Sequence, residues 1–94
     1  MSDLVLHLKK CYFEAIRDGK KTFEYREQTP YWQKRLVGRM YDGIQLQCGY
    51  PKAGDKSRII RRRWQGYEKD SILHKHFGDR PVFVFAIRVN GEDL

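Results

Sequence analysis

The chain lacks several features that would assign it to a common class of enzyme or membrane protein. It has only two cysteines and three prolines in 94 residues, and no apolar run approaches the roughly 20 residues of a membrane-spanning helix. It has no P-loop and no glycine-rich dinucleotide fingerprint. Its first residues show no charged stretch followed by a long apolar one, as a signal peptide has. We therefore expect a cytoplasmic protein with no cofactor and no membrane partner.

The few residues that bind metals or form disulfides are poorly placed to do so. Cys11 and Cys48 have no metal-type spacing, and without an export signal we expect both to be reduced and buried. His74 and His76 are two residues apart, which places them on different faces of a helix. The sequence thus predicts no metal site.

Acidic residues are scarce relative to basic ones. Twelve Asp and Glu against nineteen Lys and Arg give a net charge of +7. This balance suits a polyanionic partner, of which nucleic acid is the first choice. The hydrophobic content of 40% and the aromatic content of 14% argue against disorder. The length predicts a single domain over residues 1–94.

Apolar periodicity predicts a sheet-dominated chain. The expected order is a strand at 4–8, a helix at 12–18 ending at Gly19, strands at 22–26 and 44–48, and a strand at 58–65. One or two helical turns are expected at 31–36, a helix capped by Asp70 or Ser71 that ends at Gly78, and a final strand at 81–89. Phe23 and Tyr25 are the expected core pair of their strand, and Val82–Ile87 is apolar enough for a central strand.

These elements predict an α+β fold with about five strands and two or three short helices. Closing the strands into a small β-barrel would protect edges that otherwise invite aggregation. The strand at 58–65 carries arginines on both sides, so we expect it at an edge or in a protruding hairpin.

The stretch from Gly19 to Arg26 carries the most specific pattern. It fits G-x-K-x-x-E-x-R, with Gly19, Lys21, Glu24 and Arg26 at the fixed positions. In this motif, in the strand and helix before it, and more weakly in the later strands, the chain resembles the ASCH family of PUA-like β-barrels. The resemblance implies a small PUA-like barrel with a cleft lined by the motif, and relatedness to RNA-binding modules. It implies a ligand that is RNA or a nucleotide.

The motif can also be interpreted from its chemistry. Glu24 and Arg26 share one face of a strand, about 6–7 Å apart. Lys21 has the opposite parity and reaches that face only if the strand begins or bulges there. A carboxylate between two cations accepts hydrogen bonds from a base or a ribose well, whereas Lys21 and Arg26 suit phosphate or carbonyl oxygens. An exposed ladder of ion pairs is the plainer alternative.

Two enzyme alternatives remain open. The resemblance extends to amidohydrolases of acetylated cytidine, which match at Lys21 and Arg26 but carry a threonine nucleophile where this chain has Glu24. Thr22 lies on the same strand face and would substitute if a deprotonated Lys21 activated it. A ribonuclease would use Glu24 with a histidine, either His7 or His74, although His7 also fits a hydrogen-bonded structural role.

A second candidate surface is rich in arginine. Arg58, Arg61, Arg62 and Arg63 precede Trp64, and such a strand could bind phosphates and stack an unpaired base. The alternative is an edge strand kept soluble by charge. Tyr31, Trp32, Lys34 and Arg35 form another basic and aromatic cluster, suited either to a lid on the core or to base stacking. A third class of function, a protein-interaction domain with a basic face, also stays open.

Overall fold

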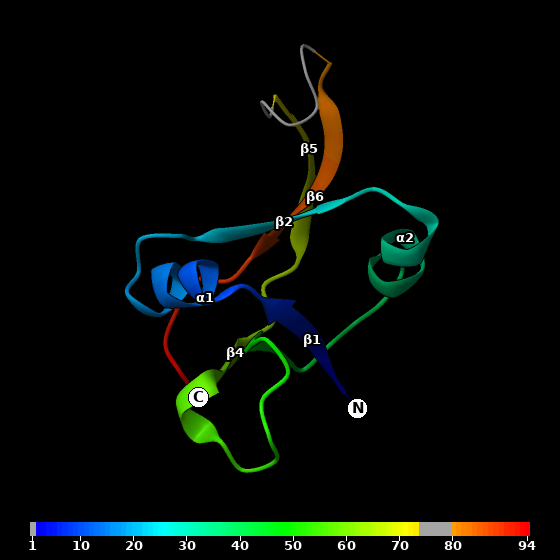
Figure 1. Cartoon of the computed structure of the whole chain (residues 1–94). Helices are drawn as coiled ribbons and strands as arrows, with labels where there is room; N and C mark the ends of the chain where they lie inside the picture. The colour runs from blue at the N-terminus through cyan, green and yellow to red at the C-terminus, as the bar shows by residue number, and fades with distance from the viewer. Residues whose placement is uncertain (1, 74–79) are drawn as a thin grey trace.

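The computed structural model describes residues 2–73 and 80–94. The elements within these residues, drawn in Figure 1, are β1 (Asp3–Leu8), α1 (Lys10–Arg17), β2 (Phe23–Glu27), α2 (Pro30–Leu36), β3 (Gly43–Cys48), the 3-10 turn η1 (Lys56–Arg58), β4 (Ile59–Arg63), β5 (Tyr67–Ile72) and β6 (Val82–Arg88). The α+β class is therefore confirmed. Over the described ranges the strands form two three-stranded sheets, and a closed barrel is not found.

The first sheet has the order β1-β3-β4. Strand β1 runs parallel to β3, with Leu4 opposite Ile44 and Leu6 opposite Leu46, and β4 pairs with β3 in the antiparallel sense. The four residues named here are buried, so the alternating apolar pattern marks the inner face of this sheet, as predicted. Strand β4 lies at the edge, which confirms the prediction made from its arginines.

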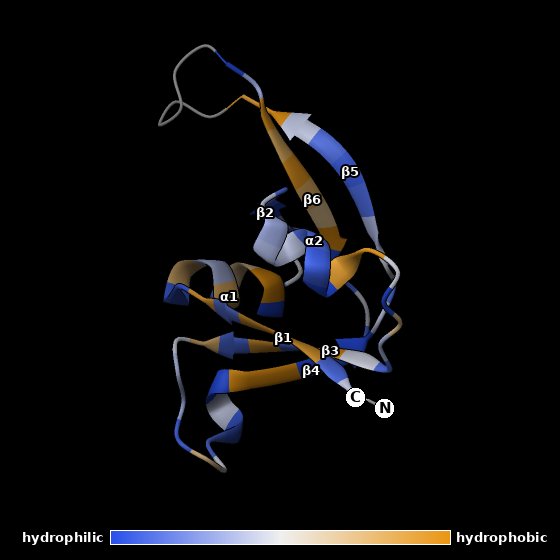
Figure 2. Cartoon of the chain, turned by 90° about the vertical axis from the view of Figure 1, so that its right-hand side faces the viewer, coloured by the Kyte–Doolittle hydropathy of each residue, from blue (hydrophilic) through white to orange (hydrophobic). Residues whose placement is uncertain are grey.

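The second sheet has the order β2-β6-β5, with β6 in the centre and both neighbours antiparallel to it. Residues Val84 to Ile87 are buried on both faces, which confirms β6 as a central strand. Figures 1 and 2 show β5 and β6 rising as a long ribbon away from the rest of the chain. In Figure 2 β6 is mostly hydrophobic and β5 mostly hydrophilic, because β5 forms the outer edge.

Strand β5 replaces the start of a predicted helix, and that prediction was wrong for residues 70–72. Tyr67 pairs with Ile87 and Ile72 pairs with Val82 across the β5–β6 ladder. The Tyr67 ring also packs edge-on against Phe85, with 5.2 Å between ring centroids. Pairing with a strong apolar strand outweighs a local capping signal. The rest of the predicted helix, including His74 and His76, lies outside the described residues.

Both α-helices form where the sequence predicts them. Helix α1 is followed by Gly19, whose φ of 77° lies in the left-handed region that glycine enters without strain. The N–H groups of Lys20 and Lys21 then turn back to donate to the Ala15 carbonyl, at 2.9 and 3.1 Å. Helix α2 begins after Thr29, whose hydroxyl accepts a hydrogen bond from the Trp32 N–H. The tight turn after α1 places Lys21 just before β2.

The core lies between the two sheets and the helices. Its buried members are Leu4, Leu6, Leu8, Phe13, Ile16, Leu36, Ile44, Leu46, Ile60, Phe85, Ile87 and Val89. Both cysteines are free thiols, but Cys11 is exposed and Cys48 half-buried, so the expectation that both are buried was wrong. Among residues 2–73 and 80–94, no helix combines the length and the hydropathy needed to cross a membrane.

Strand β2 presents the opposite face to the core from the one predicted. Glu24 and Arg26 stand opposite Ile87 and Phe85, two fully buried residues of β6. Glu24 is only 7% exposed, whereas Tyr25 is 41% exposed. The prediction that Phe23 and Tyr25 form the core pair was therefore wrong. The charged residues of the motif occupy the inner face instead.

Candidate functional site

The three charged residues of the motif converge on one point. The Lys21 Nζ lies 3.5 Å from Glu24 Oε1, and the Arg26 Nη2 lies 3.0 Å from Glu24 Oε2. Lys21 reaches the face of Glu24 because β2 begins at Phe23, so the strict alternation of a strand does not yet apply to it. Both cations are more than three-quarters buried. The arrangement is thus a partly buried triad and differs from the exposed ladder considered as an alternative.

Arg26 connects this triad to the rest of the fold. Besides Glu24, its Nη2 donates to the backbone carbonyl of His7 at the end of β1, at 3.1 Å. Its guanidinium lies 5.2 Å from the centre of the Trp32 ring on α2. A buried carboxylate is tolerated when it is paired and hydrogen-bonded, which explains why Glu24 can replace an apolar residue on the inner face. Arg26 therefore joins both sheets and α2 at the motif.

A cleft of about 610 Å³ opens beside the triad. Its lining consists of His7, Leu8, Lys9, Tyr12, Lys21, Glu24, Tyr25, Arg26, Glu27, Ile72, Val82 and Val84. One part of the wall is charged, and another part, from the β5–β6 ribbon, is aliphatic. Sites for small ligands in proteins commonly have volumes of roughly 300–1,000 Å³ and a few polar groups on an apolar wall. We call this space the first cavity.

Two tyrosine rings flank the lysine of the motif. The Lys21 Nζ lies 5.2 Å from the ring centroids of both Tyr12 and Tyr25. Each ring is close to half-exposed, so a face or an edge remains open to the solvent. An ammonium between two aromatic rings is attracted to both and is held in place. The tyrosines restrict Lys21 to the first cavity and supply flat surfaces next to it.

Arg26 also carries a donor without an acceptor. Its Nε is buried and has no hydrogen-bond partner among the described residues. A buried donor left unpaired costs about 1–3 kcal/mol. The contacts of Arg26 with Glu24 and Trp32 therefore fix its side chain at the expense of one hydrogen bond.

Sequence reasoning missed most of the other lining residues. Ile72, Val82 and Val84 were expected in a helix or in the core, and only the β5–β6 pairing brings them to the motif. His7 lines the first cavity, and its Nδ1 hydrogen-bonds the Gly49 carbonyl at 2.8 Å, as a hydrogen-bonded histidine was expected to do. Its ring also stacks on Tyr50, with 4.1 Å between centroids. The alternation of His7 with the leucines was the signal available in the sequence.

Thr22, the candidate substitute nucleophile, lies apart from the cavity. It is exposed and is not one of the lining residues, although it directly precedes β2. Its carbonyl accepts a hydrogen bond from the Val89 N–H at 3.0 Å. Thr22 thus takes part in joining β2 to the end of β6. Nothing in the geometry favours it as a nucleophile.

The arginine-rich strand does not present one surface. Arg62 is 5% exposed and points inward, whereas Arg63 and Arg58 are exposed. Arg61 forms a bidentate pair with Asp3, at 2.8 and 3.0 Å. Together with Gln45 this arginine lowers the pKa of Asp3 to about 2.

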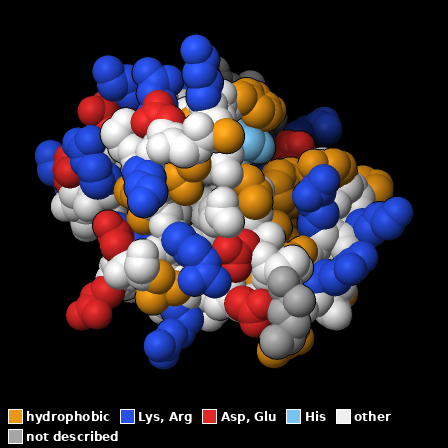
Figure 3. All heavy atoms as spheres, turned by 90° about the horizontal axis from the view of Figure 1, so that it is seen from below, with side chains coloured by type: hydrophobic (Ala, Val, Ile, Leu, Met, Phe, Trp, Pro, Cys, Tyr) orange, Lys and Arg blue, Asp and Glu red, His pale blue; other side chains and the backbone are white. Residues whose placement is uncertain are grey.

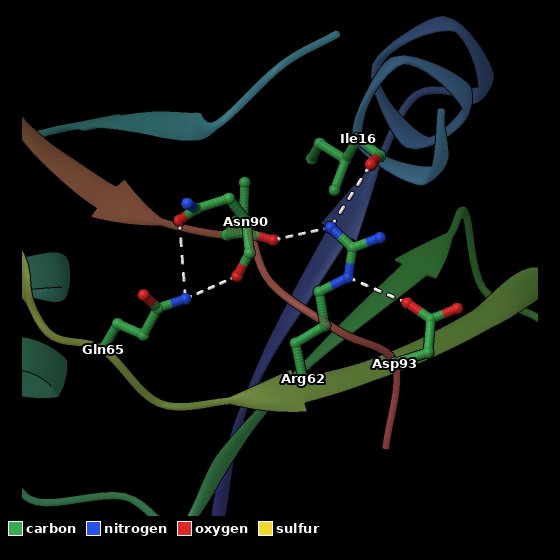
Figure 4. Close-up of polar contacts among 6 residues, drawn as sticks. Ile16, Arg62, Gln65, Asn90 and Asp93 are labelled. Atoms are coloured by element: carbon green, nitrogen blue, oxygen red, sulfur yellow. Dashed lines mark hydrogen bonds and ion pairs between the residues drawn. The ribbon is translucent and has the colours of Figure 1, made fainter. Parts of the chain in front are cut away.

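Arg62 and Trp64 both contact the interior. Arg62 donates to the backbone carbonyl of Val89. As Figure 4 shows, it also donates to the backbone carbonyl of Ile16 and pairs with Asp93. Trp64 packs edge-on against Tyr41 and against the core. Neither residue belongs to the exposed basic surface suggested by the sequence, which reduces that surface to Arg58, Arg63 and the outer side of Arg61.

The second basic and aromatic cluster is divided in the same way. Trp32 is half-buried against the core and Arg26, so it acts as part of a lid. Tyr31 is 56% exposed and is covered on one side by the Arg35 guanidinium, 4.3 Å from its ring centre. Figure 3 shows Lys and Arg side chains spread around one face and interspersed with carboxylates. On that face the positive charge does not gather in one patch.

Comparison with known proteins gives no relative for this chain. No family model matches it, and neither the search of curated proteins nor the search of solved structures gives a match. The resemblance to the ASCH family therefore rests on the motif residues and their context alone.

Proposed function

We propose that the first cavity binds a nucleotide or a segment of RNA. The observation that carries this proposal is the convergence of Lys21, Glu24 and Arg26 on the wall of a cleft that also has aromatic and aliphatic parts. The net charge of +7 favours a phosphate-bearing ligand. The resemblance to the ASCH family and its PUA-like relatives gives further support, in which case the two sheets would correspond to parts of a PUA-like barrel.

Each group has a role that suits its chemistry. Lys21 and the Arg26 guanidinium, which both line the first cavity, would donate to phosphate or to a base carbonyl. Glu24 would accept a hydrogen bond from a base amino group or a ribose hydroxyl. The rings of Tyr12 and Tyr25 would stack on a base, an interaction worth about 1–3 kcal/mol per base.

The test is fluorescence anisotropy with labelled single-stranded RNA at two salt concentrations. Wild type is compared with Lys21→Ala and with Lys20→Ala, a matched control because Lys20 is exposed and outside the cavity. We expect Lys21→Ala to weaken binding about tenfold or more, and Lys20→Ala to change it less than about threefold. Equal binding by all three proteins would refute the proposal and leave only general attraction of phosphates.

A ribonuclease activity is the second candidate, and His7 is the observation that favours it. A histidine whose Nδ1 is fixed by a carbonyl has its Nε2 free to accept a proton. The RNA recovered from the titration is examined on a gel. RNA that wild type cuts and His7→Ala leaves intact would identify a nuclease. RNA that stays intact with wild type would leave the binding function.

A further inference from the structure

A second cavity of about 430 Å³ lies next to the first. It is bounded by the end of β1, one side of α1, the end of β3 and η1, and its lining residues are Leu8, Lys9, Lys10, Phe13, Glu14, Arg17, Cys48, Gly49, Ser57 and Arg58. Its floor is apolar, since Leu8 and Phe13 are almost fully buried. Four of the ten lining residues are Lys or Arg and one is acidic, so the rim is strongly positive.

The cations of the second cavity differ in how far they are already neutralised. Arg17 pairs with Asp18 at 3.0 Å and approaches Glu14 at 3.8 Å. Arg58 has a longer pair with Asp55, at 3.7 Å, and its side chain is 61% exposed. Within residues 2–73 and 80–94, neither Lys9 nor Lys10 has an ion-pair partner. These two lysines, with the weakly paired Arg58, leave positive charge available for an anion.

The two cavities share part of their lining. Leu8 and Lys9 line both of them. Helix α1 contributes to both linings, with Tyr12 in the first cavity and Phe13 in the second. Lys9 is exposed and lines both cavities, so a ligand that spans them would pass this residue.

We propose that the two cavities form one track for single-stranded RNA, so that the ligand spans at least two nucleotides. This inference rests on the proposed function of the first cavity. One nucleotide occupies the first cavity, the following phosphate contacts Lys9, and the next nucleotide lies over the apolar floor of the second cavity with its phosphate near Lys10 and Arg58. A base must leave a helix to enter such a hollow, which favours a single strand over a duplex.

The experiment compares ligands of increasing length. Labelled uridine oligonucleotides of about two, four and eight residues are titrated by anisotropy, and uridine monophosphate is measured by competition. The proteins are wild type, Lys21→Ala for the first cavity, Lys10→Ala and Arg58→Ala for the second, and Lys56→Ala as a control. Lys56 is exposed in the same 3-10 turn as Arg58 but lines neither cavity.

We expect the four-residue RNA to bind at least about tenfold more tightly than the monophosphate. Lys10→Ala and Arg58→Ala should each weaken RNA binding about threefold to tenfold and leave the affinity for the monophosphate unchanged, while Lys56→Ala has no effect on either affinity. Lys21→Ala should weaken the binding of both ligands. The track is refuted if the monophosphate binds as tightly as the RNA, or if Lys10→Ala and Arg58→Ala behave like Lys56→Ala.

Failure of the track and failure of the proposed function give different results. If Lys21→Ala weakens the binding of both ligands but Lys10→Ala and Arg58→Ala change neither affinity, the first cavity binds a nucleotide and the track is wrong. If Lys21→Ala changes the affinity for neither ligand, the proposed function itself is wrong, and the track is then wrong as well because it rests on that function. A duplex of the same length that binds as well as the single strand would also overturn the track.

Discussion

Arg62 provides the sharpest test of how this small fold is held together. Its side chain is almost fully buried, and it donates to the carbonyls of Val89 at 2.9 Å and Ile16 at 3.3 Å. Its Nε pairs with Asp93 at 2.9 Å. These partners come from α1, from the residue after β6 and from the end of the chain, and Figure 4 shows Ile16 and Asp93 on either side of Arg62. The change to make is Arg62→Met, which keeps much of the volume and removes every donor.

The expected loss in the free energy of unfolding depends on which hydrogen bonds the partners of Arg62 retain in Arg62→Met. The Ile16 carbonyl still accepts from the Gly19 N–H at 3.1 Å, and the Asp93 side chain is 62% exposed and can be hydrated. The Val89 carbonyl loses its donor inside the protein, which costs about 1–3 kcal/mol. With the lost charge-assisted bond to Ile16, we expect Arg62→Met to lower the free energy of unfolding by about 2–4 kcal/mol. Asp93→Asn should cost less than about 1 kcal/mol, because the amide oxygen can still accept from the Arg62 Nε and because the Asp93 side chain is 62% exposed.

The assay is equilibrium unfolding in urea, followed by the fluorescence of Trp32 and Trp64 and by circular dichroism. Against a small domain's total stability of about 5–15 kcal/mol, the expected loss moves the midpoint clearly. A loss below about 1 kcal/mol for Arg62→Met would refute the reasoning. So would an equal loss in Asp93→Asn, because the ion pair with Asp93 and not the buried carbonyls would then carry the stability.

Three further outcomes are expected. The pKa of Asp3 is lowered to about 2 in the folded state, so its stabilising effect is present above about pH 4 and is lost as the pH falls toward 2. In acid titrations followed by unfolding, wild type should lose at most about 2 kcal/mol more stability than Asp3→Asn over this range, a limit reduced by the partial exposure of Arg61. Gly19→Ala should lower the free energy of unfolding by about 1 kcal/mol in urea, because φ is 77° there. It should also weaken RNA binding by displacing Lys21, and unchanged anisotropy would contradict this link. Tyr25→Ala should weaken RNA binding about fivefold or more with unfolding unchanged within about 1 kcal/mol, since its ring is 41% exposed beside Lys21.

Several elements could be predicted because their signals are local. The alternation of Leu4, Leu6 and Leu8 indicates a strand with one apolar face, and the structure places that face in the core. Gly19 ends α1 because glycine adopts the left-handed conformation without strain, whatever residues surround it. The apolar run of β6 indicates a central strand because residues that are apolar on both faces must be covered on both faces. The motif could likewise be recognised as a group whose members approach one another.

Other features depend on residues far away in the chain, so no local pattern reveals them. Alternation along β2 defines two faces, but Glu24 lies inward because Lys21 and Arg26 neutralise it, and because Arg26 finds the carbonyl of His7. Tyr67 begins a strand because β6 pairs with it. The aliphatic wall of the first cavity also depends on this pairing, because the β5–β6 ladder brings Ile72 and Val82 to the motif.

The sequence by itself determined the periodicity of the elements, the ends of the helices and the positive charge, since these follow from side chains and their near neighbours. Only the tertiary structure decided which face of β2 and which arginine of β4 would be buried. Burial of a charge is favourable only when its partners are in place, and the partners of Arg62, at Ile16, Val89 and Asp93, come together only once both sheets have formed.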